Sequence, residues 1–355
     1  MRPVSIDTPP ETLCILRLSA LGDVTHVVPV VRTLQRHWPA TRLTWIVGRT
    51  EHALLEGLEG VEFVVVDKRA GLEAWRALRR RLRSRRFDVL FHMQTSLRAS
   101  LYATAVRARL RVGFDRARAR DLQWLFTNRR IAPKPRQHVL ESFFEFPAVL
   151  GLEARELRWD IPIPEADRQW ARTVTGARRP TLVISPCSSF GYRNWLPERY
   201  AAVARHAVER HAMQVVLSGG PSAIEREYAE AIRRRAGVPV TDLVGRTSLK
   251  QALALLERAT VLVAPDSGPA HMATAVGTPV IGLYASTNPD RARPYRSARW
   301  TVNRYPEALQ AEFGLRVEDA PWGKRVRAPH AMARITVEDV TRRLDRLLAA
   351  REATA

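Results

Sequence analysis

Short runs of Val, Ile and Leu alternate along this chain with longer stretches of helical spacing, and this alternation limits the possible folds more than any other feature. The runs that we predict as strands are Leu13–Leu18, Leu43–Val47, Phe63–Val66, Val89–Met93, Leu182–Ser185, Val215–Leu217, Val261–Ala264 and Val280–Leu283. Helices are predicted over Val24–His37, Leu72–Arg85, Ser96–Arg109, Glu198–His211, Ser222–Arg235, Leu249–Arg258 and Ala270–Val276. Strands that alternate with helices are typical of parallel sheets built from βαβ units, covered by helices on both faces. The sequence therefore predicts an α/β protein.

Two prolines in the segment Asp160-Ile-Pro-Ile-Pro164 interrupt this alternation and favour an extended connector. The chain has 355 residues, more than one hydrophobic core usually organises. We therefore expect two Rossmann-like domains that face each other across a cleft, one over residues 1–160 and one over residues 161–335. A last helix is expected at Thr336–Ala350, within a terminal segment 336–355 that could pack back across the domains.

Positive charge is concentrated in one part of the chain. The sequence carries 57 Lys and Arg against 36 Asp and Glu, a formal net charge of +21. Residues 68–136 hold 20 of these basic residues and only 4 acidic ones. Such a stretch indicates an anionic partner, which could be nucleic acid, acidic lipid or a phosphorylated glycan; the alternative is a solvated helix face.

Cysteine usage and the N-terminus favour a cytoplasmic location. Cys14 and Cys187 are the only cysteines, too few for a disulfide framework or a zinc site. No apolar run reaches the roughly 18–20 residues that span a bilayer. Arg17 and Asp23 interrupt the one candidate for an apolar signal region, so we expect no signal peptide.

Several common site motifs do not occur in this sequence. It has no G-x-G-x-x-G, no phosphate-binding G-x-x-x-x-G-K-[ST], no H-E-x-x-H, no G-x-S-x-G and no D-x-D pair. We therefore expect no metal and no cofactor, with the backbone and side chains handling any phosphate charge.

Three polar loops follow predicted strands, and ligands of open α/β sheets bind at the carboxyl ends of strands. The first loop, Arg17–Asp23, ends on an acidic residue that could cap the next helix or accept a proton at the edge of a cleft. The second, Pro186–Trp195, offers serine hydroxyls and the charge of Arg193 for an anion, or is an ordinary surface turn. The third, Ala264–His271, leads into a helix of small residues whose start favours a diphosphate, although capping and packing are the simpler roles there.

Four segments together carry a resemblance over nearly the whole chain to glycosyltransferase family 9, the ADP-heptose:lipopolysaccharide heptosyltransferases. They are Leu18-Ser-Ala-Leu-Gly-Asp-Val-Thr-His26, Phe87-Asp-Val-Leu-Phe-His-Met-Gln94, Ser185-Pro-Cys-Ser-Ser189 with Arg193-Asn-Trp195, and Asp266-Ser-Gly-Pro-Ala-His271. The resemblance implies a GT-B fold and metal-independent, inverting transfer of heptose from ADP-heptose. It places the acceptor on the N-terminal domain and the donor on the C-terminal domain.

The resemblance also implies roles for individual residues. Asp23 matches the catalytic base. The donor would be held by Ser188, Ser189 and Arg193 at its phosphates and by Asp266, Ser267, Gly268 and His271 at the sugar and diphosphate. The adenine is expected against Gly245-Arg-Thr-Ser-Leu249, which contributes Thr247 and Leu249. The slot of the ribose-binding carboxylate holds Ala223, so Glu225 is expected to substitute.

The acceptor implied by the resemblance is Kdo-lipid A at the cytoplasmic face of the inner membrane, which gives the basic stretch an anionic ligand. The residues expected to bind it are Arg17, Ser19, Lys68, Arg69, Gln94, Arg118, Arg120 and His138, with further basic candidates at Arg76, Arg79, Arg80, Arg83 and Arg116. Two alternatives stay open: a GT-B transferase with another nucleotide sugar or acidic acceptor, and a non-enzymatic nucleic-acid binder. No nucleic-acid motif occurs in the basic stretch, so nucleic acid is not the expected partner.

Overall fold

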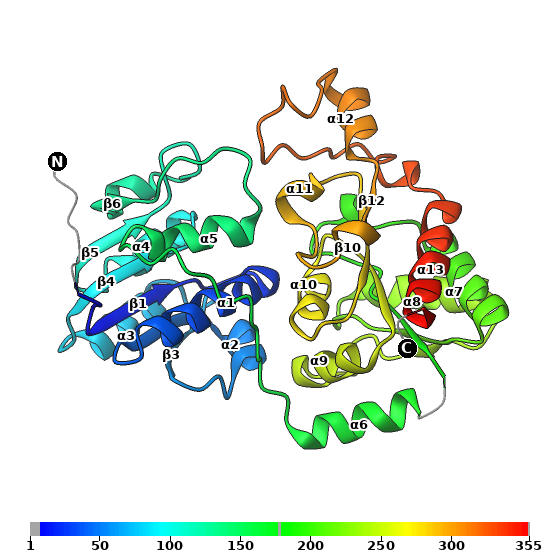
Figure 1. The fold of residues 1–355 in the computed structure, drawn as a ribbon, viewed down its shortest axis with the longest axis horizontal. Coiled ribbons are helices and arrows are strands. Elements are labelled where there is room, and N and C mark those ends of the chain that lie inside the picture. Colours follow the sequence, from blue (N-terminus) through cyan, green and yellow to red (C-terminus); the bar gives the residue numbers. More distant parts are fainter. Residues whose placement is uncertain (1–7, 177–178, 354–355) are drawn as a thin grey trace. The chain divides into compact units, whose positions relative to one another are not determined.

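The computed structural model describes residues 8–176 and 179–353, and the chain divides into two compact units between Pro162 and Ile163. The division lies inside the proline-containing segment that was expected to be a connector. Each unit holds one six-stranded parallel sheet with helices packed on it, so the predicted α/β class is confirmed (Figure 1). No helix in the described ranges has both the length and the apolar character needed to cross a bilayer.

The sheet of the first unit has the strand order β3-β2-β1-β4-β5-β6. Its strands are β1 Thr12–Leu16, β2 Arg42–Gly48, β3 Val61–Val66, β4 Phe87–His92, β5 Ala108–Gly113 and β6 Arg129–Arg130. The helices between and after them are α1 Leu21–His37, α2 Arg49–Leu55, α3 Gly71–Leu82, α4 Leu97–Ala103, the short 3-10 helix η1 Gln123–Phe126, and α5 Val139–Ala148. This is the strand order of a dinucleotide-binding Rossmann sheet.

Apolar side chains on both faces of this sheet explain why its strands are continuous apolar runs. Cys14 and Leu16 of β1 belong to a buried cluster with residues of α3 and α4, and these two helices lie against each other. The alternate residues Leu13 and Ile15 are equally buried, and α1 packs on α5 and α2. Burial of both faces explains why residues 13–16 of β1 are all apolar.

The second unit repeats the same order as β12-β11-β10-β7-β8-β9. Its strands are β7 Thr181–Ile184, β8 Gln214–Leu217, β9 Thr241–Asp242, β10 Val261–Pro265, β11 Val280–Tyr284 and β12 Val302–Asn303. Its α-helices are α6 Glu165–Thr175, α7 Pro197–His211, α8 Ala223–Ala236, α9 Leu249–Arg258, α10 Gly268–Ala275, α11 Pro289–Ala292, α12 Tyr305–Phe313 and α13 Val337–Glu352.

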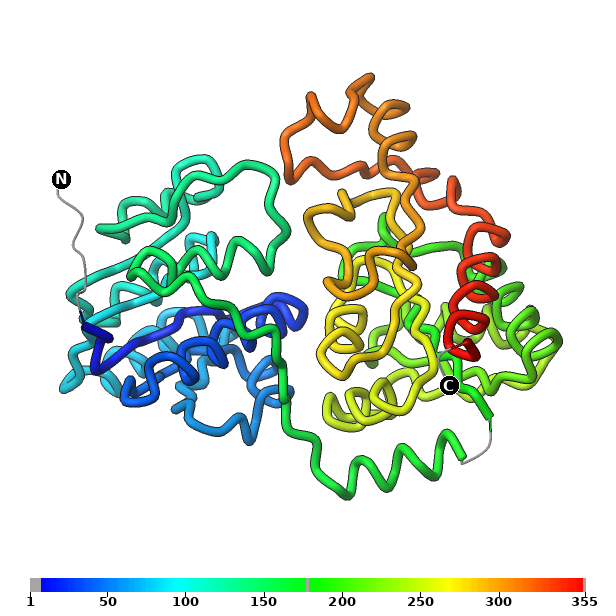
Figure 2. The backbone as a smooth tube through the Cα atoms, in the orientation of Figure 1, coloured from blue at the N-terminus to red at the C-terminus, as the bar shows by residue number. Residues whose placement is uncertain are grey.

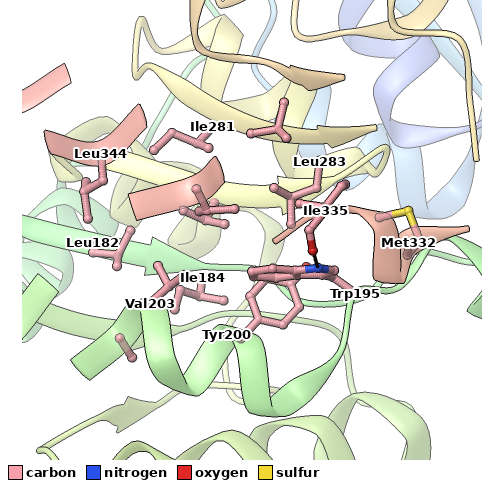
Figure 3. Close-up of a cluster of buried hydrophobic side chains, with 14 of the residues drawn as sticks. Leu182, Ile184, Trp195, Tyr200, Val203, Ile281, Leu283, Met332, Ile335 and Leu344 are labelled. Atoms are coloured by element: carbon pink, nitrogen blue, oxygen red, sulfur yellow. Dashed lines mark hydrogen bonds between the residues drawn. The ribbon is translucent and has the colours of Figure 1, made fainter. Parts of the chain in front are cut away.

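The core of the second unit ties the last helix to the sheet (Figure 3). The indole Nε1 of Trp195 donates a hydrogen bond of 3.0 Å to the carbonyl oxygen of Ile335, and its ring meets Tyr200 edge-on at 5.0 Å. Leu344 of α13 is fully buried in this cluster. The terminal helix lies along α7, as the red and green coils in Figure 2 show, and its apolar face is part of the second core.

One predicted helix is wrong. Residues Ser96–Arg109 were expected to be helical throughout, but α4 ends at Ala103 and β5 begins at Ala108. The side chain of Arg111 explains the error, because it turns inward from β5 and donates to the carbonyl oxygens of Ala103, Val106 and Phe126. A strand with a half-buried arginine lacks the apolar run by which the other strands were predicted.

Candidate functional site

In each sheet the order of the strands reverses at one point, between two neighbouring strands. Polar side chains lie at this switch point. In the first unit the chain continues from β1 and from β4 to opposite sides of the sheet, so its switch point lies between these strands. In the second unit the switch point lies between β7 and β10. Open α/β sheets bind ligands at such points, outside the carboxyl ends of the strands. The three predicted loops follow β1, β7 and β10.

Asp23 lies at the switch point of the first unit, in the first turn of α1. Its carboxylate forms an ion pair with Arg17 and accepts a hydrogen bond from the backbone N–H of Ala20 at 3.2 Å. Arg17 also donates to the carbonyl oxygen of Met93, directly after β4, and lies over the ring of Phe143 at 5.3 Å. About a third of the Asp23 side chain stays exposed. The carboxylate thus both supports the helix start and faces solvent.

Gln94 fixes the loop that carries Asp23. Its side-chain oxygen accepts from the backbone N–H of Leu18 at 2.7 Å, and its amide nitrogen lies 3.4 Å from the hydroxyl of Ser19. Gln123 in turn donates to the carbonyl oxygens of His92 and Gln94. The structure therefore brings Ser19 and Gln94 together with Arg17 and Asp23 at the end of β1 and β4.

His138 begins α5 and is buried. Its Nδ1 accepts from the backbone N–H of Leu140 at 3.1 Å, and its ring meets that of His26 edge-on at 5.5 Å. Both imidazoles are therefore in the packing between α1 and α5, and a capping role is established for His138. Contact with the acceptor stays a prediction.

Two of the expected acceptor cations are already engaged. The ammonium of Lys68 lies 2.9 Å from both carboxylate oxygens of the buried Glu51. Arg118 pairs with Asp115 and donates to the side chain of Gln137 at 2.6 Å. The carboxylate partner of Lys68 and the amide partner of Arg118 lie 17 and 19 residues away along the chain, so sequence patterns did not reveal them.

The remaining basic candidates are exposed. Some lie near the carboxyl ends of the strands in the first unit, and others lie near the opposite edge of the sheet. Arg69 and Arg120 are exposed on loops that follow β3 and β5, at the same sheet edge as Asp23. Helix α3 starts at that edge and runs toward the opposite one over 12 residues, a length of about 18 Å. The exposed side chains near its far end are those of Arg79, Arg80 and Arg83.

Asp266 and Arg193 form the centre of the second unit's switch point. The Arg193 guanidinium lies 3.1 Å from the Asp266 carboxylate, and each side chain is little exposed. His271 Nε2 lies 3.9 Å from the same carboxylate. Burial by itself would raise the pKa of Asp266, but His271 and Arg193 outweigh it and hold that pKa below its usual value. Asp266 therefore stays ionised and orients Arg193.

The start of α10 has no side-chain cap. Ser267 occupies the N-cap position, yet its hydroxyl makes no cap hydrogen bond, whereas the N-cap residues Ser222 and Ser248 bond the first turns of α8 and α9. The Ser267 hydroxyl is buried and has no hydrogen-bond partner among the described residues, and the same holds for Nε of Arg193 and the hydroxyl of Tyr192. Together with the uncapped start of α10, these groups leave hydrogen-bonding capacity that a polar ligand could use.

The loop after β7 itself carries Arg193, together with Ser188 and Ser189. The backbone N–H of Ser188 donates to Asn194 at 2.8 Å, and the Ser188 hydroxyl accepts from the backbone N–H of Phe190 at 3.1 Å. Ser189 is exposed. The guanidinium of Arg193 lies over Phe190 at 5.0 Å, so this aromatic ring holds it from one face.

Two further loops lie side by side after β8 and β9. Glu225 accepts from the backbone N–H of Gly220 at 2.8 Å and from the hydroxyl of Ser222 at 2.7 Å. The N–H of Gly245 donates to the carbonyl oxygen of Gly219 at 3.0 Å, which places the half-buried Thr247 and Leu249 beside the Glu225 loop. Glu225 is thus part of a helix cap, a role that the sequence analysis did not assign.

A segment near the C-terminus reaches this site, and the sequence analysis missed it. The backbone N–H of Val326 donates to the carbonyl oxygen of Ser286, in the loop after β11, at 3.0 Å. This brings Arg325 over Phe190 at 5.6 Å and Arg327 over Tyr192 at 5.8 Å. The basic run 324–327 was a visible signal, but nothing in its spacing connects it with residues 190–193.

The chemistry of the second site is that of an anion pocket. Burial raises the pKa of Cys187 to about 12, and the charge of Glu225 adds to this effect, so its thiol is no nucleophile. Positive charge comes from Arg193, Arg325 and the first turn of α10. In the described ranges, the one cluster of three or more potential metal ligands is His206, His211 and Asp345, on α7 and α13.

Known proteins are similar to this chain over most of its length. Residues 75–316 match the family described as "Glycosyltransferase family 9 (heptosyltransferase)". The lipopolysaccharide core heptosyltransferase OpsX of Haemophilus influenzae is 40% identical over 338 residues, which cover 95% of this chain and 97% of the relative. Lipopolysaccharide heptosyltransferase 1 of Pseudomonas aeruginosa is 29% identical over 78% of this chain and 79% of its own length.

Solved structures share the fold. A family 9 glycosyltransferase from Veillonella parvula superposes with a TM-score of 0.78 at 19% identity, covering 96% of this chain and 97% of that one. The Escherichia coli heptosyltransferase WaaC, solved with ADP-2-deoxy-2-fluoro heptose, gives a TM-score of 0.69 at 19% identity and covers 94% and 99%. Both sheets of this chain therefore belong to a GT-B architecture.

Proposed function

Because this chain belongs to glycosyltransferase family 9, we propose that it is a heptosyltransferase of lipopolysaccharide core biosynthesis. The observation that carries this proposal is the uncapped start of α10 beside the Asp266–Arg193 pair. Its unpartnered buried groups suit a diphosphate, and OpsX of Haemophilus influenzae, which matches nearly the whole chain, is a lipopolysaccharide core heptosyltransferase. The donor is ADP-heptose and the acceptor is the Kdo-lipid A inner core.

On the donor side, the diphosphate is bound at the first turn of α10 and by Arg193. As the bond between the anomeric carbon and the phosphate oxygen breaks, negative charge grows on that oxygen. Arg193 and the N–H groups of α10 stabilise this charge without a metal ion, because they are already oriented before the reaction. Ser188 and Ser189 add hydroxyl contacts, and the loops with Glu225, Thr247 and Leu249 hold the nucleoside.

On the acceptor side, Asp23 is the general base. It removes the proton of the attacking hydroxyl while a new bond forms between that oxygen and the anomeric carbon, with inversion of configuration. The ion pair with Arg17 and the bond from Ala20 hold the carboxylate in one orientation, and its exposed third is open to a substrate hydroxyl. General base catalysis of this kind contributes roughly 10²–10⁴-fold in rate.

The experiment combines donor screening with product analysis. ADP-, UDP- and GDP-sugars are compared by thermal shift, and transfer from ADP-heptose to Kdo-lipid A is followed by mass spectrometry. We expect stabilisation by ADP and ADP-heptose and a product heavier by one heptose. A shift with UDP- or GDP-sugars alone, or no heptosylated product, would contradict the proposed donor and acceptor.

Acceptor binding on the first unit is tested with two sets of arginines. The double variant Arg69→Gln with Arg120→Gln removes two exposed charges at the edge of the sheet where Asp23 also lies. We expect the KM for the acceptor to rise while the affinity for ADP stays unchanged. Arg234→Gln with Arg235→Gln is the matched control, because these two exposed residues lie on α8 of the second unit. An equal rise in KM for both pairs would assign the effect to overall charge rather than to a site.

We also propose that the first unit associates peripherally with the cytoplasmic face of the inner membrane. Exposed leucines lie at the start of α3, along α4 and in or next to η1, and we call them the leucine face: Leu72, Leu97, Leu101, Leu122 and Leu125. Helix α4 contacts both α3 and η1. Arginines accompany these leucines, with Arg79 over Trp75 and Arg116 over Trp124. Apolar side chains flanked by arginines and tryptophans suit the surface of an anionic bilayer.

Sedimentation with phosphatidylethanolamine vesicles, with and without phosphatidylglycerol, tests this association. We expect binding that needs the anionic lipid and that falls when Leu72, Leu101 and Leu125 are replaced by Gln. Ile224→Gln removes an exposed apolar side chain from α8 and serves as the control. Binding that is unchanged by the leucine substitutions would contradict the leucine face as the membrane surface.

A further inference from the structure

We propose that His206, His211 and Asp345 form a binding site for one divalent transition-metal ion of the zinc type, which fastens the terminal helix α13 to α7. The Nε2 atoms of both histidines point at the same carboxylate oxygen of Asp345, at 2.7 Å from His206 and 2.6 Å from His211. The two rings lie 5.5 Å apart between their centroids. All three ligand atoms lie within 4.8 Å of one another.

The donor set selects the class of ion. Two imidazole nitrogens and one carboxylate oxygen suit Zn²⁺ and neighbouring transition metals, whereas Ca²⁺ and Mg²⁺ prefer oxygen donors alone. In a tetrahedral zinc site, metal–ligand distances near 2.1 Å place the ligand atoms about 3.4 Å apart. The two nitrogen–oxygen separations, 2.7 and 2.6 Å, are shorter than this by about 0.7–0.8 Å, so small side-chain rotations suffice to admit an ion. Three protein ligands leave the fourth position to water.

Solvent reaches this cluster. The side chains of His206 and His211 are about a quarter and a fifth exposed, and that of Asp345 is 39% exposed. His211 also lines a surface hollow of about 920 Å³, whose other residues include Glu209, Arg210, Arg351 and Glu352. Two carboxylates and two guanidinium groups balance the charge of its lining, so a cation meets no net positive barrier there.

An ion bound by this cluster has a structural role, because the cluster lies far from the donor loops. Helix α7 starts after the Arg193 loop and ends at His211, 15 residues later, which is about 22 Å along its axis. The ion would therefore lie at the end of α7 remote from the donor loops and would not touch a substrate. By joining α7 to α13 it stabilises the docking of the last helix, which the buried Leu344 also anchors. An ion at this place has no part in the proposed transfer reaction.

Zinc binding to the full-length chain, prepared without an added histidine tag, tests the proposal. Isothermal titration with Zn²⁺ at pH 7.5 is expected to show one ion per chain, and Co²⁺ in its place should give the visible absorption of a four-coordinate site. His206→Gln, His211→Gln and Asp345→Asn should each weaken zinc binding by at least about 10-fold, since changes even to residues behind the ligands commonly cost that much. A hundredfold excess of free Zn²⁺ over its Kd should raise the wild-type Tm by roughly 5 °C or more.

His330→Gln is the matched control, because this histidine is exposed on a loop outside the cluster. Its zinc affinity and Tm shift should equal those of the wild type. Absence of stoichiometric zinc binding to the wild type would overturn the proposal and leave a hydrogen-bonded trio without a metal. So would binding that survives all three ligand substitutions, which would place the ion elsewhere.

Discussion

Replacing Arg193 with Met tests the anion pocket of the second unit most sharply. Methionine keeps much of the apolar length of the side chain and can still pack on Phe190, but it removes the guanidinium that lies 3.1 Å from Asp266. Two consequences follow. The diphosphate loses a charge-assisted donor, and the carboxylate of Asp266 stays in the pocket with the Nε2 atom of His271 at 3.9 Å.

The expected loss of ADP affinity follows from these two effects. A hydrogen bond to a charged group contributes roughly 1.5–3 kcal/mol, which corresponds to about 10- to 150-fold in Kd. The contribution of Arg193 to ADP binding in the wild type is smaller than this full value, because Arg193 divides its charge between the ligand and Asp266. The uncompensated Asp266 carboxylate acts in the opposite direction, since it repels the diphosphate in a little-exposed site. We therefore expect Arg193→Met to weaken ADP binding by about 100-fold.

Calorimetric titration with ADP separates the two effects. Adding Asp266→Asn to Arg193→Met removes the repulsion without restoring the donor, so the double variant should regain about 10-fold of the lost affinity. Arg234→Met on α8 controls for loss of an exposed arginine and should bind ADP as the wild type does. Wild-type affinity in Arg193→Met would refute the assignment of Arg193 to the diphosphate. Absence of any recovery in the double variant would show that Asp266 does not act through charge.

Two further predictions concern metals and pH. Initial rates of heptose transfer should be the same in EDTA as in Mg²⁺ or Mn²⁺, because Arg193 and the start of α10 supply the positive charge that stabilises the leaving diphosphate. A strict need for either ion would contradict this expectation. Burial, aided by the charge of Arg111, lowers the pKa of His92 to about 3, so the folded chain keeps this ring neutral where the unfolded chain protonates it. The stabilising contribution should therefore be fully present above the unfolded pKa of about 6.5 and should decline as the pH falls toward 3. At pH 4.5 the loss of unfolding free energy is roughly 3 kcal/mol. Denaturant unfolding of His92→Gln should lack this loss, whereas His37→Gln, an exposed control, should keep it.

Burial decided which parts of the fold could be predicted from the sequence. Strands such as β1 and β10 are covered on both faces, so they appear as apolar runs that need no knowledge of their neighbours. The helix predicted through Arg109 failed because Arg111 turns inward and bonds carbonyl oxygens that only the folded chain brings near. Helix α5, rich in phenylalanine and buried over most of its length, lacks the polar face by which amphipathic helices are recognised.

The candidate site could also be predicted only in part. Placement of polar loops after β1, β7 and β10 could be predicted, because chain order fixes which ends of parallel strands meet. The partners of individual charges could not: Lys68 pairs with Glu51, and Arg325 reaches Phe190 from 135 residues further along the chain. Such pairs depend on tertiary distances, and no residue spacing records them.

Turnover by Asp23→Asn is the most direct measurement of the proposed mechanism. Asparagine keeps the shape of the side chain and can still accept from the N–H of Ala20, so the start of α1 should persist. We predict that kcat for heptose transfer falls by at least about 100-fold while the Kd for ADP stays that of the wild type. A kcat close to the wild-type value in this variant would contradict the account, because the first unit would then supply no base to the reaction.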